Sequence, residues 1–257
     1  MRNKLTDELA VCGLNAVRAA AEYHPEKINR LFLREDRLKL FSGICSRLAE
    51  RKRPYKLCGD EEMERICKSA HHQGVVAMII EPEIERLGKE DLERWAHDKK
   101  TGIVLCSVGN DHNLGAIVRA AAFFDCSYMV ISSDDPGASL TTSAYRVAEG
   151  GMEHVTIRRV ENVAAFLRDA SRLLLTIGTD VRARRRIRDL PDIAAGMNAG
   201  GPERSGTVLV MGNEESGLPR AVKDACSVLL RIPGTGLMES LNVAQAAALF
   251  LHEIYEM

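Results

Sequence analysis

Runs of consecutive apolar residues recur in the second part of the chain, with glycine turns and helical stretches between them. The runs occupy residues 102–108, 127–133, 172–178, 207–212 and 228–233. Strands that are apolar on both sides are typical of a parallel sheet covered on both faces, and their alternation with helices indicates an α/β domain of Rossmann-like layout. We expect this domain to extend from residue 101 to residue 257.

The first part of the chain alternates helical patterns with short apolar runs, the last of which follows a turn at Gly74. Residues 81–100 carry many charges and only a sparse apolar stripe, which indicates a partly helical acidic connector. The pattern therefore predicts a small α/β domain at residues 1–80, a linker at residues 81–100 and the larger domain at residues 101–257.

One predicted helix, at residues 111–125, is apolar on nearly all sides but carries Arg119 in its middle. Positions three and four away on a helix share its face, and here they bear no charge: Gly115, Ala116, Ala122 and Phe123. Leaving a buried charge without its partner costs about 3–5 kcal/mol, so Arg119 needs a partner from elsewhere. Two interpretations stay open: a carboxylate of another segment pairs with Arg119, or its guanidinium points into a functional site.

Composition narrows the class of protein. The 257 residues carry a formal net charge of −1, so nucleic-acid binding would depend on local basic patches such as residues 182–189. The seven cysteines have neither the spacing of a zinc site nor that of a disulfide framework, which is typical of reduced thiols in a cytosolic protein. No stretch is a signal core or a membrane span, so we expect a cytoplasmic protein without a metal and without membrane contact.

Ligands of open parallel sheets bind beyond the carboxyl ends of the strands, so the segments that follow the apolar runs are candidate sites. In GNEESGLP, Gly212 would let a ligand approach the backbone and Gly217 would allow a tight turn around Glu214. The segment has neither a dinucleotide fingerprint nor a Walker A pattern, and the alternative is a simple turn with Glu214 capping a helix.

The segment PGTGLMESLNV follows the last apolar run. Ser240 stands at a plausible N-cap of the helix that follows, which is its ordinary structural interpretation. The presence of Asn242 just inside that helix has no strong structural explanation. A helix N-terminus that carries Ser and Asn is also suited to holding a polar ligand.

Three motifs follow predicted strands in the order N-x-G-x-x-x-R, G-x-E-x-x-G, and I-P with S-L-N-V. Their residues are Asn113, Gly115 and Arg119; Gly212, Glu214 and Gly217; and Ile232, Pro233 and Ser240 to Val243. In this order they resemble the three motifs of the SpoU/TrmH-type RNA ribose methyltransferases of the SPOUT superfamily. The resemblance covers about residues 100–257, with Gly234 where the family usually has Met. HQGVVA at residues 72–77 is similar to the end of the small RNA-binding substrate domain that often precedes this catalytic domain.

The resemblance implies a parallel sheet with a C-terminal trefoil knot, S-adenosylmethionine held in that knot, and a homodimer with the active site at its interface. The catalytic residues that it implies are Arg119, Asn113, Glu214, Ser240 and Asn242. Contacts with the cofactor are expected from Gly212, Ile232, Leu241 and Thr179, with Asp180 beside them.

In such a reaction Arg119 would stabilise the alkoxide that forms at a ribose 2′-hydroxyl and hold a nearby phosphate, with Glu214 as its counter-charge. The family's arginine has been proposed as a general base, but a side-chain pKa above about 12 favours electrostatic stabilisation. RNA phosphates would contact Arg182, Arg184, Arg185, Arg186 and Arg188, unless these residues form only a solvated charged loop.

The sequence therefore predicts an S-adenosylmethionine-dependent methyltransferase acting on the ribose 2′-hydroxyl of tRNA or rRNA. A catalytically silent RNA-binding protein of the same fold is the alternative. A nucleotide-dependent oxidoreductase is disfavoured because G-x-G-x-x-G is missing.

Overall fold

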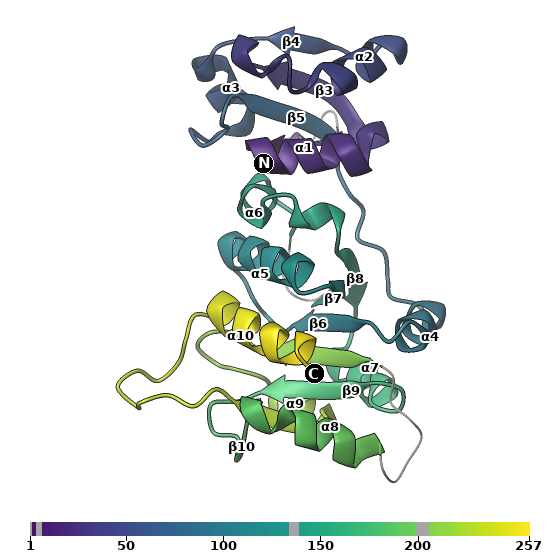
Figure 1. Ribbon diagram of the computed structural model, residues 1–257, viewed down its shortest axis with the longest axis vertical. Coiled ribbons are helices and arrows are strands. Elements are labelled where there is room, and N and C mark those ends of the chain that lie inside the picture. The colour runs from purple at the N-terminus through teal and green to yellow at the C-terminus, as the bar shows by residue number, and fades with distance from the viewer. Residues whose placement is uncertain (1, 4–6, 134–138, 199–205) are drawn as a thin grey trace. The chain divides into compact units, whose positions relative to one another are not determined.

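The computed structural model describes residues 2–3, 7–133, 139–198 and 206–257 and divides into two compact units (Figure 1). Unit 1 comprises Met1–Glu83 and Ser139–His154, and unit 2 comprises Ile84–Ala138 and Val155–Met257. Each unit is an α/β structure with its own sheet. The domain limits at residues 80 and 101 stay a prediction.

Unit 2 contains a seven-stranded sheet in the order β10-β12-β9-β11-β6-β7-β8. All of its neighbouring strands pair in parallel, which confirms the predicted parallel sheet. The strands are β6 (Thr101–Leu105), β7 (Cys126–Ser132), β8 (Thr156–Val160), β9 (Leu175–Thr179), β10 (Arg185–Arg186), β11 (Thr207–Met211) and β12 (Val228–Arg231).

Helices cover both faces of this sheet. Val104 and Val208 belong to a core cluster with side chains of α4, α7 and α9, whereas their neighbours Ile103 and Leu209 are fully buried outside that cluster. Since side chains alternate between the faces of a strand, both faces are buried. The helices are α4 (Lys89–His97), α5 (Asp111–Phe123), α7 (Val163–Ala170), α8 (Leu190–Asn198), α9 (Arg220–Ala225) and α10 (Val243–Tyr255), and α10 packs against α5 (Figure 1).

The second part of the predicted connector is built into unit 2. Trp95 of α4 is fully buried, stacks on Tyr128 at 5.0 Å between ring centroids, and donates from Nε1 to the Lys100 carbonyl at 2.7 Å. A Cβ at Gly102 would lie 1.7 Å from the Trp95 ring, so glycine is required where the indole crosses β6. The sparse apolar stripe of residues 81–100 therefore includes a core residue of unit 2.

Unit 1 contains a five-stranded sheet in the order β1-β2-β5-β3-β4. Its strands are β1 (Arg2–Asn3), β2 (Glu8–Cys12), β3 (Ile28–Leu33), β4 (Tyr55–Leu57) and β5 (Val75–Ile80), and its helices are α1 (Leu14–Tyr23), α2 (Ser42–Glu50), α3 (Asp60–Cys67) and α6 (Thr142–Ala148). The segment HQGVVA forms the turn into β5: the Gly74 N–H donates to Nδ1 of the buried His72 at 3.1 Å. Gly74 has φ +80°, a conformation that glycine adopts without strain.

In the part of the chain that the structure describes, no helix combines the length and the apolar character of a membrane span.

Candidate active site

The three sequence motifs meet at one edge of the unit 2 sheet. Because β6, β11, β9 and β12 are parallel neighbours, their carboxyl ends lie along the same edge. The segment leading into α5 follows β6, residues 212–219 follow β11, and residues 232–242 lead from β12 to α10 (Figure 1). This is the position at which open α/β sheets bind ligands.

Side-chain hydrogen bonds connect one residue from each motif. Asn113 of α5 donates from Nδ2 to Glu214 Oε1, and its Oδ1 accepts from Asn242 Nδ2 at 3.0 Å. These contacts span 101 and 129 residues of sequence. Asn113 is therefore the link between the second and third motifs, as the predicted grouping of the three residues requires.

The start of α10 determines which atoms of this network donate and which accept. Asn242 Oδ1 accepts from the backbone N–H groups of Ala244 and Gln245, which can only donate. Its Nδ2 must therefore face Asn113, whose Oδ1 accepts. Asn113 Nδ2 is then left to donate to the carboxylate of Glu214. The orientation of both side-chain amides is thus fixed without reference to hydrogen positions.

The N-cap of α10 is Asn242, and the expectation that Ser240 caps this helix is wrong. Both residue types cap helices well, but α10 begins at Val243, so Ser240 lies outside the first turn. The side chain of Ser240 is exposed. Asn242 therefore has the structural role that the sequence did not reveal, and it combines the cap with the contact to Asn113.

The second motif forms a tight turn over residues 213–217. The Gly217 N–H donates to the Asn213 carbonyl at 2.9 Å, and Gly217 has φ +67°, as the tight-turn expectation requires. Gly212 has a steric reason to be glycine, while the predicted approach of a ligand to its backbone stays a prediction. A Cβ at Gly212 would lie 2.4 Å from the Gly217 carbonyl carbon, so the position is glycine because its own turn folds back onto it.

Arg119 lies on an exposed stripe of α5. Arg119 and Phe123, four positions apart, are both exposed. Together with Ala116, Ala120 and Phe124 they line a cavity of about 240 Å³. Within the described residues no carboxylate forms an ion pair with Arg119, and Glu214 bonds to Asn113 and Asn213 instead. The predicted counter-charge is therefore wrong for the single chain. Asn113 and Arg119 are six residues apart, so they project from different sides of the helix.

The predicted cofactor residues line up along the same strand ends. Thr179 ends β9, Gly212 follows β11, Ile232 follows β12, and Leu241 precedes α10. The Thr179 hydroxyl donates to the Val210 carbonyl at 3.1 Å, so its side chain is engaged in joining two strands. Leu237 and Met238, in the loop before Leu241, are 88% and 80% exposed, respectively. Large apolar side chains and turn backbone at a strand edge fit an adenosine group, whose faces are apolar and whose rim takes hydrogen bonds.

Asp180, expected beside these residues, is held by the ammonium group of Lys223 and by a backbone N–H. Burial would raise the pKa of its carboxyl, but hydrogen bonds from Lys223 Nζ at 2.7 Å and from the Arg182 backbone N–H at 2.8 Å keep the pKa below its usual value. Asp180 therefore organises the start of the arginine-rich segment.

Comparison with known proteins identifies the chain. Residues 100–252 match the model of the SpoU rRNA methylase family, and residues 10–85 match that of the RNA 2′-O ribose methyltransferase substrate-binding domain. The chain belongs to the SpoU rRNA methylase family. The predicted family, its RNA 2′-O-methyltransferase activity and its use of S-adenosylmethionine are thereby confirmed, and the oxidoreductase alternative is excluded.

Relatives of this family match nearly the whole chain. The 23S rRNA (guanosine-2′-O-)-methyltransferase RlmB of Pseudomonas aeruginosa is 31% identical over 95% of this chain and 94% of its own length. RlmB of Nitrosomonas europaea is 29% identical over 98% and 92%, respectively. The crystal structure of an AdoMet-bound rRNA methyltransferase from Sinorhizobium meliloti has a TM-score of 0.73 at 22% identity and covers 98% of this chain and 88% of that one. This last likeness confirms the predicted α/β fold with its parallel sheet, whereas the trefoil knot stays a prediction.

The arginine-rich segment of this SpoU family member leaves most of its charges exposed. Arg182, Arg184, Arg185 and Arg188 are exposed and Arg186 is half-buried. In the described parts of the chain none of their guanidinium groups forms an ion pair; the carboxylate of Asp189 accepts from the Arg186 backbone N–H at 2.8 Å. The segment therefore presents free cations, which suits contact with phosphates.

Two residues of the site were missed by the sequence. Asn213 anchors the second motif: its Oδ1 accepts from the backbone N–H groups of Glu215 and Ser216, and its Nδ2 donates to the Ser107 carbonyl at 2.9 Å. Its place between Gly212 and Glu214 was a signal, because Asn commonly closes such turns with its side chain. Ser107 has φ +58° and gave no signal in the sequence.

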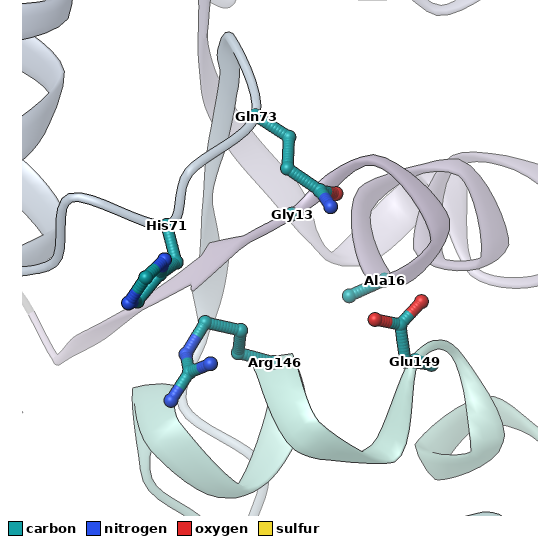
Figure 2. A pocket seen from close by; sticks show the side chains of 6 residues that line it. All are labelled: Gly13, Ala16, His71, Gln73, Arg146 and Glu149. Carbon is teal, nitrogen blue, oxygen red and sulfur yellow. The ribbon is translucent and has the colours of Figure 1, made fainter.

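A second cavity, of about 200 Å³, lies in unit 1 and contains none of the predicted site residues (Figure 2). It is lined by Gly13, Ala16, His71, Gln73, Arg146 and Glu149. Its amide and carboxylate are engaged, because Gln73 Oε1 accepts from the Leu14 N–H and Glu149 from Asn15 Nδ2. Across the described ranges no group of three or more His, Cys, Asp or Glu side chains is arranged to hold a metal ion.

Proposed function

We propose that this protein methylates the ribose 2′-hydroxyl of a guanosine in 23S rRNA. The proposal rests on the hydrogen-bond network Glu214–Asn113–Asn242, which assembles the three family motifs at the ligand-binding edge of the sheet. The rRNA guanosine as target is supported by full-length relatives that carry this activity in their names. Between the two RNA classes that the sequence left open, rRNA is therefore favoured over tRNA.

The cofactor would be held at the carboxyl ends of β12, β9 and β11. Bound there, S-adenosylmethionine supplies a sulfonium methyl group that is already electrophilic. Backbone groups of Gly212, Ile232 and Leu241 would bind it, with Thr179 beside them, and the apolar loop before Leu241 would exclude water. The trefoil knot implied by the resemblance belongs to this proposal and is supported by the packing of α10 against α5 and β11.

The chain's own contribution to the reaction is placement and charge. A ribose 2′-hydroxyl is a poor nucleophile, so the oxygen needs a cation beside it as negative charge develops. Arg119 would supply that cation and clamp an adjacent phosphate. Glu214, Asn113, Ser240 and Asn242 would orient the ribose by hydrogen bonds, since the network holds three of them in fixed orientation.

A homodimer would place Arg119 in a site. Phe123 of α5 and Leu249 and Tyr255 of α10 are 79%, 46% and 61% exposed, respectively, although they are large and apolar. Phe124 joins the two helices, with its ring 6.1 Å from that of Tyr255. An exposed apolar patch across two packed helices is typical of a protein interface. A second copy covering this patch would also enclose Arg119, which lies on the same stripe of α5.

RNA would be bound by the arginine-rich segment, Arg182, Arg184, Arg185 and Arg186, and by the domain proposed at residues 1–80. The match of residues 10–85 to a substrate-binding family supports that second role. Because the substrate would be ribosomal RNA and all seven cysteines are free thiols, we infer that the protein works in the cytoplasm.

The role of Arg119 is tested by Arg119→Ala. We expect this variant to lose methyl transfer to 23S rRNA while calorimetry shows nearly unchanged binding of S-adenosylmethionine. Arg172→Ala is the matched control, because Arg172 is another exposed arginine of unit 2 that lies outside the site, and it should retain activity. Activity of Arg119→Ala within about threefold of wild type, a difference of less than about 1 kcal/mol in the barrier, would refute the role. Wild-type protein that binds RNA but never methylates it would favour the silent RNA-binding alternative.

A further inference from the structure

Two arginines stand side by side at the edge of the unit 2 sheet. Strand β10 pairs in parallel with β12, so that Arg185 lies opposite Leu230 and Arg186 opposite Arg231. Directly paired residues of neighbouring strands project to the same face, and neighbouring strands are about 5 Å apart. The side chains of Arg186 and Arg231 therefore share one face, and both are half-buried.

Neither guanidinium group has a counter-charge among the residues that the structure describes. Two carboxylates are near, and both are already engaged. Asp189 accepts from the Arg186 backbone N–H at 2.8 Å. Asp180, whose own N–H donates to the Leu230 carbonyl, accepts from Lys223 Nζ at 2.7 Å and from the Arg182 backbone N–H at 2.8 Å.

This arrangement is unfavourable without an anion. Like charges directly opposite each other on neighbouring strands repel, and a guanidinium group does not escape by losing its proton. Lys223 adds a third cation close to the single carboxylate of Asp180. The backbone register thus places both arginines on one face at the same edge of the sheet.

We propose that Arg186 and Arg231 together bind a single phosphodiester group of the RNA substrate. This inference rests on the proposed function and deepens it. Two forked guanidinium groups on one face match the several oxygens of a tetrahedral phosphate. Arg186 is flanked in sequence by the exposed arginines Arg182, Arg184, Arg185 and Arg188, which could contact further phosphates of the same RNA. Arg231 directly precedes Ile232, so the bound phosphate lies next to the residues proposed to hold the methyl donor.

The salt dependence of RNA binding tests the proposal. Each phosphate contact with single-stranded nucleic acid contributes about 0.7 to the slope of log affinity against log salt. The probe is a fluorescein-labelled single-stranded RNA, into which the full-length protein is titrated while anisotropy is recorded. For Arg186→Gln combined with Arg231→Gln, the slope is expected to fall by about 0.7, because one shared phosphate is lost. Arg220→Gln is the matched control: Arg220 is exposed and pairs with Asp224, and its slope should equal that of wild type.

Other outcomes overturn the proposal. A fall of about 1.4 in the double variant would mean two separate phosphates, and an unchanged slope would mean none. Loss of S-adenosylmethionine binding in calorimetry, with an unchanged RNA slope, would instead assign the pair to the cofactor carboxylate. Arg186→Lys, which keeps the charge at β10, should keep the slope and thereby exclude misfolding as the cause. Methyl transfer by the wild-type preparation is measured in parallel: its absence would refute the proposed function, whereas its presence with an unchanged slope would refute only this inference.

Discussion

Replacing Gly212 with alanine should displace the turn over residues 213–217 by a distance that the structure defines. The new Cβ would lie 2.4 Å from the Gly217 carbonyl carbon and 2.6 Å from the Leu218 nitrogen, both of them backbone atoms. Ordinary contact begins at 3.4 Å, so residues 213–217 must retreat by 3.4 − 2.4 = 1.0 Å. Because both atoms belong to the backbone, no side chain can relieve the clash by changing its rotamer.

The expected loss of activity is larger than the expected loss of stability. Overpacking of this kind costs about 1–3 kcal/mol, which lowers the midpoint of thermal unfolding by roughly 2–12 °C. A misplacement of about 1 Å at a catalytic group costs on the order of a hundredfold in rate. Glu214 lies in this turn, so its hydrogen bond with Asn113 should lengthen. With the role proposed for Glu214, kcat/KM for the proposed 23S rRNA substrate should fall by about that factor.

The assay combines methyl-transfer kinetics with thermal unfolding of the same preparations. Gly196→Ala is the matched control, since Gly196 lies in α8 with no atom within 4 Å of the added Cβ. It should leave activity unchanged and keep or slightly raise stability, because alanine favours a helix by about 1 kcal/mol over glycine. Gly212→Ala with wild-type kcat/KM would show that the turn does not position a catalytic group, and our reasoning about it would be wrong.

Two further predictions concern the third motif and the dimer. Asn242→Asp should keep the cap of α10 but lose the donor to Asn113, so activity falls with little change in the free energy of unfolding. Asn242→Ala should also cost about 0.5–2 kcal/mol of stability. Equal stability of both variants would argue against the cap. Phe123→Asp should convert the proposed dimer to a monomer in sedimentation velocity and reduce methyl transfer. Tyr23→Asp, at an exposed aromatic of unit 1, is the control. A wild-type protein that sediments as a monomer would refute the proposed interface.

The sequence predicted the sheet of unit 2 well because its signal is local. Five apolar runs correspond to β6, β7, β9, β11 and β12, whose core side chains are buried on both faces. Strand β8 was not predicted, because its sequence TIRRV contains two arginines and is not a continuous apolar run. It is an edge strand of the sheet. The sequence also did not predict that Ser139–His154 belongs to unit 1, because no local pattern indicates which sheet a helix will cover.

The sequence named Asn113, Glu214 and Asn242 together, but it did not predict the hydrogen bonds that connect them. Choosing between Ser240 and Asn242 as the cap required the length of the loop after β12, which depends on where α10 docks against α5. The surroundings of Arg119 were misjudged because an apolar helix was expected to be covered by its own chain, whereas its stripe is exposed. The pairing of Arg186 with Arg231 joins two strands that are distant in sequence, and spacing along the chain carries no sign of it.

The amide of Asn113 makes the assembly of the site depend on two segments that lie far from it in sequence. Its two partners are translated about a hundred residues or more after it, and the second of them starts the last helix in the chain. Until both Glu214 and Asn242 have folded into place, the Asn113 amide lacks a partner for its donor or its acceptor. The turn that carries Glu214 then lacks its contact with α5. Methyl transfer should therefore require that α10 has folded, because only then does Asn242 reach Asn113.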